Sequence, residues 1–176
     1  MKMTDLFRDE LKREAAVTRP LLERVPEGCS DWKPHAQSMP LGYLATLVAT
    51  LPSLIVVMVD QDELDMNPPG ASRYKPESLR TREELVEAFD RHVAKACETL
   101  ANTTDDHLLT PWRFLAAGRV VDEQPRHVML RDAVFNDLAH HRGQLTVYLR
   151  LNSASARLST ASPLTKTDSD RLIPMP

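Results

Sequence analysis

Apolar residues recur at helical spacing in four separate segments of the chain. These segments cover about residues 4–22, 38–55, 81–100 and 129–151. Residues three and four positions apart lie on one face of an α-helix, so each segment would present one apolar stripe to a common core. The pattern predicts four helices with stripes formed by Phe7, Leu11, Ala15, Thr18 and Leu22; Leu41, Leu44, Ala45, Val48, Leu51 and Ile55; Leu85, Phe89, Val93, Ala96 and Leu100; and Leu130, Val134, Leu138, Leu145 and Tyr148.

Local signals mark where these helices begin and bend. Thr4 and Ser38 stand where a side-chain oxygen would cap the first and second helices. Thr81, followed three residues later by Glu84, has the pattern of a capping box at the start of the third helix. Pro52 lacks a backbone N–H and should kink the second helix.

The connections between the helices are polar and irregular. Residues 60–80 form a loop too long for a simple turn, and such loops often cover a site. Residues 102–126 contain three breakers and predict a crossover with a short helix around residues 105–109. No segment shows the alternation of a β-strand. We therefore expect an all-α, up-and-down four-helix bundle over residues 1–152, followed by a polar tail over residues 153–176.

Charge and hydropathy exclude several classes of partner. The net charge is −3 at pH 7 and no basic run is longer than a pair, so a nucleic-acid partner is not expected. The longest apolar run, residues 47–59, falls short of the roughly twenty residues that span a bilayer, and no membrane partner is expected either. The charged N-terminal segment does not resemble a signal peptide, which predicts a cytoplasmic protein.

The fourth segment carries the most informative polar residues. Asp137 and His141 are one helical turn apart and fall within the apolar stripe, so both are expected to point into the protein. Three interpretations remain open. The pair supplies two ligands to a divalent metal ion, with a third from Glu14 or His92; or the two side chains hydrogen-bond each other; or they form a metal-free acid–base pair facing a pocket.

A family resemblance rests on the same segment. The stretch HHRGQLTVYLR, residues 140–150, resembles the last core helix of the DinB/YfiT-like superfamily of metal-binding four-helix bundles. TRPLLE at 18–23, WKPHAQS at 32–38 and LGYLATLVAT at 41–50 follow the order found in such proteins. The resemblance covers roughly residues 6–151, and it implies the bundle fold.

The resemblance also implies a metal site with three histidine ligands, one from the second helix and two from the last. Here Leu47 occupies the second-helix position and Asp137 the first position on the last helix, and only His141 is retained. Leu47 cannot ligate a metal. The resemblance therefore predicts an incomplete site at Asp137 and His141, holding at most a weakly bound divalent metal such as zinc or nickel.

Two functions follow from these observations. The first is a non-catalytic or small-molecule-binding protein that has the fold without complete metal chemistry, and Leu47 favours it. The second is a divalent-metal-dependent thiol transferase or hydrolase. Asp137 supports this alternative because a carboxylate can ligate a metal ion. The resemblance also implies a homodimer formed through helix faces, and the long apolar second helix supports this expectation because one subunit does not easily cover it.

Overall fold

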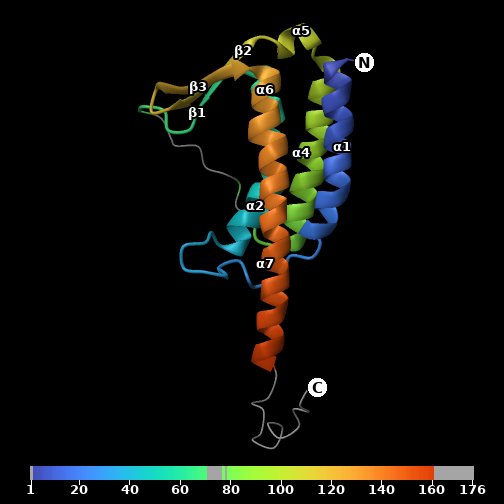
Figure 1. Ribbon diagram of the computed structural model, residues 1–176, viewed down its shortest axis with the longest axis vertical. Helices are drawn as coiled ribbons and strands as arrows, with labels where there is room; N and C mark the ends of the chain where they lie inside the picture. Colours follow the sequence, from blue (N-terminus) through green and yellow to red (C-terminus); the bar gives the residue numbers. More distant parts are fainter. Residues whose placement is uncertain (1, 71–76, 78, 161–176) are drawn as a thin grey trace, which may run out of the picture.

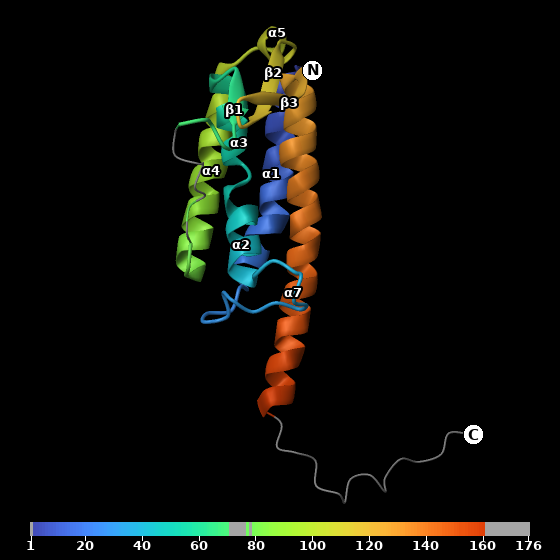
Figure 2. The same ribbon diagram turned by 90° about the vertical axis from the view of Figure 1, so that its left-hand side faces the viewer.

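The computed structural model describes residues 2–70, 77 and 79–160 of the chain. Three long helical columns stand side by side (Figure 1). They are α1 (Met3–Leu22), α4 (Arg82–Asn102), and a column that ends in α7 (Asp137–Thr160). Two shorter helices, α2 (Leu41–Thr50) and α3 (Ser53–Asp60), stand end to end beside α4 and complete the helical layer (Figure 2).

The last helical column is continuous but changes its winding. It consists of α6 (Arg126–Leu130), a π-helical segment η1 (Arg131–Asn136), and α7. The column begins a few residues before the expected start at Met129 and runs on to Thr160. Part of the segment that we expected to be an extended tail is therefore helical, whereas residues 161–176 lie outside the described residues.

Pro52 divides the second predicted helix, as expected. The axes of α2 and α3 are bent by 47° at this break, because proline removes one backbone hydrogen bond and its ring clashes with the preceding turn. No single described helix is long and apolar enough to cross a membrane, and only the bent pair reaches the length and composition of a span.

The predicted helix caps are correct at one helix and wrong at two. At α4 the Thr81 hydroxyl accepts from the Glu84 N–H and the Glu84 carboxylate accepts from the Thr81 N–H, which completes the capping box. Helix α1 instead begins before Thr4, and the Asp105 carboxylate accepts from the Met3 and Thr4 N–H groups at 2.9 and 3.0 Å. A side chain distant in sequence thus provides the cap that we assigned to Thr4.

At α2 the backbone of the preceding loop replaces the cap expected from Ser38. The N–H groups of Leu41 and Gly42 donate to the carbonyl oxygens of Trp32 and Ser30, both at 2.9 Å. This crossing of the loop requires a glycine, because a Cβ at Gly42 would lie 2.8 Å from the Ser30 Cβ. The loop is therefore held against the first turn of α2.

A small sheet, which the sequence analysis did not predict, lies beside one end of the helices. Strand β1 (Glu63–Asp65) pairs in parallel with β2 (Pro111–Ala116), and β2 pairs antiparallel with β3 (Arg119–Pro125). The short helix expected near residue 105 is present as α5 (Asp105–Leu108). The fold is thus mostly helical, but it is not made of helices alone.

The core has two parts along the helices. One joins α2 to the middle of α7 and includes Leu44, Val48 and Leu145. The other joins α3 to α5, β2 and η1 and includes Ile55, Leu108 and Trp112. Burial of these side chains, each worth about 1.5–3 kcal/mol, fixes α2 and α3 between α4 and the last column (Figure 2).

Candidate functional site

Of the three residues that the sequence placed in one site, the structure exposes one and half-buries two. Asp137, the first residue of α7, is exposed to solvent, so the expectation that it points into the protein is wrong. His141 is half-buried one turn later. Leu47 on α2 is also half-buried and packs against the apolar cluster that contains Leu138 and Leu145.

Regular helix geometry places Asp137 at the edge of the apolar stripe. Successive residues of an α-helix are about 100° apart, so Asp137 lies about 100° from Leu138 and about 80° from Leu145 around α7. Both leucines are buried, and the π-helical segment η1 ends just before Asp137. The apolar stripe continues through Leu138 and Leu145 and leaves Asp137 outside it.

His141 pairs with Gln144 rather than with Asp137. The imidazole Nδ1 lies 2.9 Å from the Gln144 Oε1, which accepts a hydrogen bond from the tautomer that is protonated at Nδ1. Within the described ranges no hydrogen bond connects Asp137 to His141. The exposed His140 ring lies edge-on to the His141 ring, with centroids 4.9 Å apart. The Nε2 of His141 is left as the acceptor nitrogen.

The other two candidate ligands are engaged elsewhere. Glu14 accepts a hydrogen bond from the Arg142 guanidinium in a half-buried ion pair between α1 and α7. His92 on α4 lies 3.2 Å from the Glu77 carboxylate, and burial lowers its pKa while Glu77 partly opposes this effect. Among the residues that the structure describes, no group of three or more His, Cys, Asp or Glu side chains is placed to hold a metal ion.

The side chains at the three expected ligand positions therefore do not fit a three-histidine metal site. Leu47 offers no donor atom, and Asp137 is directed to solvent. His141 alone combines a suitable donor with a partner that orients its ring, which is the usual arrangement of a metal-binding histidine. A site with one oriented imidazole leaves the remaining coordination positions to water.

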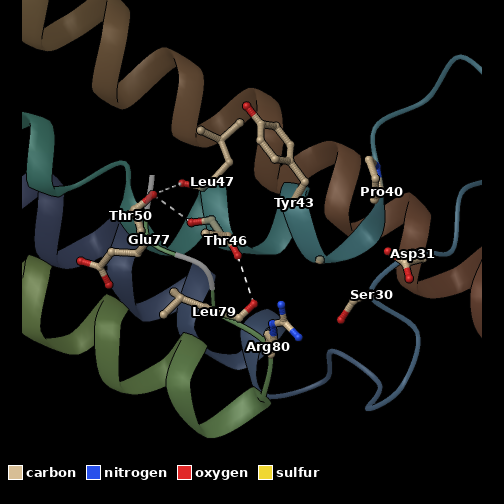
Figure 3. Close-up of a pocket in the computed structure, with 11 residues that line it drawn as sticks. Ser30, Asp31, Pro40, Tyr43, Thr46, Leu47, Thr50, Glu77, Leu79 and Arg80 are labelled. Carbon is tan, nitrogen blue, oxygen red and sulfur yellow. Dashed lines mark hydrogen bonds between the residues drawn. The ribbon is translucent and has the colours of Figure 1, made fainter. Parts of the chain in front are cut away.

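A cavity of about 540 Å³ lies on another side of Leu47 (Figure 3). Helix α2 forms one wall, and the loop before α2 and the segment that leads into α4 form the others. Its volume falls in the range of small-molecule sites in proteins. The lining residues are Ser30, Asp31, Pro40, Gly42, Tyr43, Thr46, Leu47, Thr50, Glu77, Leu79 and Arg80.

Local contacts hold the walls of this cavity in place. The buried Thr46 hydroxyl donates to the Leu79 carbonyl oxygen at 3.4 Å, and Thr50 donates to the Thr46 carbonyl oxygen at 2.9 Å. The Arg80 N–H donates to the Glu84 carboxylate at 2.7 Å. This last contact, with the capping box of α4, lowers the pKa of Glu84 because the N–H groups of Arg80 and Thr81 stabilise its charged form. The segment around Arg80 is thereby fixed relative to α2.

Several solved structures are similar to this chain, and two of them are DinB-like proteins. A DinB-like protein from Bacillus subtilis, YjoA, superposes with a TM-score of 0.62 over 84% of this chain and 92% of its own, at 19% identity. A DinB-like protein from Bacillus cereus superposes with a TM-score of 0.64 over 84% of this chain and 91% of its own, at 20% identity. The chain has a DinB-like fold. No family model and no curated protein matches its sequence.

The DinB-like fold confirms the resemblance drawn from residues 140–150 and 32–50. The likeness extends over 84% of the chain. Identities near 20% establish the fold alone. The chemistry of this chain has to be argued from its own side chains.

Sequence reasoning missed most of the residues around the cavity. It did indicate that the polar loop over residues 60–80 would lie near a site, and Glu77, Leu79 and Arg80 line the cavity. Ser30, Asp31, Thr46 and Thr50 carry no local signal, because their common position depends on the loop crossing at Gly42. The cavity brings the polar side chains of Ser30, Asp31, Thr46, Thr50, Glu77 and Arg80 together on one side of Leu47.

Proposed function

We propose that this chain is a non-catalytic, small-molecule-binding protein built on a helical bundle of the DinB-like kind. Its ligand would occupy the cavity between α2 and the segment that leads into α4. The observation that supports this most directly is the cavity itself, which has the volume of a small-molecule site and is lined by both apolar and polar side chains.

The donor set near Leu47 also favours binding over metal catalysis. A catalytic zinc site usually takes three protein ligands and keeps one position open. Leu47 removes one of the expected ligands, and Asp137 is exposed on α7. In the proposed role, the ligand is bound by the walls of the cavity and no metal ion is needed.

A metal-dependent thiol transferase or hydrolase is the second candidate. The orientation of His141 by Gln144 favours it, because this contact leaves Nε2 free to act as a ligand. In that case a divalent ion such as zinc or nickel would be held weakly, mainly by His141 with Asp137. Bound metal would supply Lewis-acid chemistry to a thiol or a water molecule.

A cavity-filling substitution tests the first candidate. Thr50 is half-buried at the cavity wall, so Thr50→Trp should occupy the space without entering the core. In a thermal-shift and calorimetry screen of small molecules, compounds that bind the parent protein should bind Thr50→Trp at least tenfold more weakly. Val17→Trp, on an exposed face of α1, is the matched control. Ligands that bind both variants equally would rule out this cavity as the site.

Metal analysis separates the two candidates. Protein purified without a metal-affinity tag should contain zinc and nickel well below one ion per chain. Calorimetry with either ion should show no tight site, and His141→Ala should change little. One tightly bound ion per chain that is lost in His141→Ala would support the metal-dependent enzyme instead.

A further inference from the structure

Two opposite charges face the cavity from different segments. Asp31 comes from the loop before α2 and Arg80 from the segment before α4, and both side chains are exposed at its walls (Figure 3). No ion pair joins them, so their charged atoms are more than 4.0 Å apart. Neither side chain forms a hydrogen bond or a salt bridge in the part of the chain that the structure describes, although the Arg80 charge also acts on the Glu84 carboxylate and helps to lower its pKa.

The third charged group at the cavity is already neutralised. The Glu77 carboxylate pairs with the Arg91 guanidinium at 3.0 Å and lies 3.2 Å from the His92 Nε2. Both partners belong to α4, and Figure 3 shows the Glu77 carboxylate on the side of that helix. Asp31 and Arg80 are therefore the charges left for a ligand.

The surface between these charges suits a short molecule with an apolar part. Ser30 contributes a hydroxyl beside Asp31, and Leu47 and Leu79 contribute apolar surface on the α2 side and the α4 side. Tyr43 is 53% exposed and adds an aromatic edge. An aliphatic or aromatic side chain would bury surface against these groups.

We propose that the ligand is a zwitterion of the amino-acid or short-peptide class with an apolar side chain. Its carboxylate would pair with the Arg80 guanidinium, whose planar fork matches a carboxylate, and its ammonium group would pair with the Asp31 carboxylate. This inference rests on the proposed binding function and specifies the ligand. Both charges are solvent-exposed, so each contact is weak and dissociation constants between about 10 μM and 1 mM are expected.

Probes that carry one or both charges test the assignment by calorimetry. L-phenylalanine and L-leucyl-L-leucine carry both charges, N-acetyl-L-phenylalanine carries only the carboxylate, and L-phenylalanine amide carries only the ammonium group. The variants are Arg80→Gln and Asp31→Asn, with Arg24→Gln and Asp106→Asn as exposed controls away from the cavity. Equal unfolding midpoints for all four variants would establish that each is folded.

The expected pattern is reciprocal. Arg80→Gln should weaken binding of L-phenylalanine and its N-acetyl derivative about tenfold and leave the amide unchanged. Asp31→Asn should weaken L-phenylalanine and the amide about tenfold and leave the N-acetyl derivative unchanged. Thr50→Trp should weaken both zwitterions, and the two control variants should behave as the parent protein does.

Two other results are distinguishable. The zwitterion assignment is overturned if neither zwitterion binds with a dissociation constant below about 1 mM. It is also overturned if Arg80→Gln and Asp31→Asn bind the zwitterions as tightly as the parent protein does. In that case, the proposed binding function would still be supported if neutral compounds from the screen bound the parent protein and bound Thr50→Trp more weakly. If no compound of either kind is sensitive to Thr50→Trp, the cavity function fails as well.

Discussion

Asp105 shows how a single side chain connects the start of α1 to a segment about a hundred residues later. It is the first residue of α5, and its carboxylate accepts hydrogen bonds from the N–H groups of Met3 and Thr4 at the start of α1. These two bonds lower the pKa of Asp105 below its ordinary value of 3.8. The charged carboxylate also lies at the positive end of the α1 dipole.

We expect Asp105→Asn to lower the free energy of unfolding at neutral pH. The folded pKa of Asp105 is depressed, so its stabilising effect is complete above pH 3.8 and is lost as the pH falls through the lower folded value. The difference in stability between the parent and Asp105→Asn should therefore shrink in acid. Urea unfolding at pH 7 and near pH 3 would measure it.

The matched control is the neighbouring residue. Asp106 is exposed on the same short helix, so Asp106→Asn should leave stability nearly unchanged at both pH values. A stability difference for Asp105→Asn that stays constant down to pH 2 would contradict the capping role of the charged carboxylate.

At the scale of elements, Arg126 joins the sheet to the last helical column. It is the first residue of α6 and only 2% exposed. Its guanidinium donates to the Thr110 hydroxyl, the Pro111 and Gln61 carbonyl oxygens and the Asp62 carboxylate. One buried guanidinium therefore binds both the start of β2 and the segment that precedes β1.

Arg126→Met should destabilise the protein by about 2–4 kcal/mol. The methionine keeps most of the apolar volume but removes the four hydrogen bonds of the buried guanidinium, and a hydrogen bond to a charged group contributes about 1.5–3 kcal/mol. Arg113→Met is the control, because Arg113 forms an exposed ion pair with Glu63 that is worth at most about 1 kcal/mol. Chemical denaturation of both variants would measure the two losses in the free energy of unfolding. Equal losses would show that the buried Arg126 guanidinium stabilises the protein no more than the exposed one of Arg113.

At the scale of the whole molecule, α2 is not the surface through which the predicted homodimer would form. Most apolar residues of α2 are covered within the chain, including Leu41, Leu44 and Val48. Helix α7 instead has an exposed face, with Val147 43% exposed and Gly143 one turn earlier. Among the described residues, no atom outside the helix's own neighbouring backbone lies within 4 Å of a Cβ placed at Gly143, so no contact within the described structure requires this glycine.

We expect the protein to dimerise through this face of α7. A glycine one turn from an exposed valine would allow a second helix to approach closely. Light scattering at micromolar concentration should give twice the mass of the chain, and Val147→Glu should give the monomer mass. Val17→Glu, on an exposed part of α1, should remain dimeric. A monomeric parent protein would refute the prediction.

The sequence by itself determined the features that depend on neighbours along the chain. The apolar stripes located α1, α4 and most of the last column, because side chains three and four residues apart share a face in any helix. Thr81 with Glu84 and the break at Pro52 were predictable for the same local reason. Together with the motif at residues 140–150, these signals were sufficient to indicate a DinB-like fold.

Only the tertiary structure decided the features that depend on distant contacts. Strand β1 is three residues long and exists through pairing with β2, almost fifty residues away, so no local pattern marks it. Asp137 is exposed beside the buried Leu138, because burial at the edge of an apolar stripe depends on which elements pack against the helix there. The cavity exists because the loop that crosses α2 at Gly42 brings Asp31 to the same space as Arg80, and such closeness follows from packing rather than from sequence order.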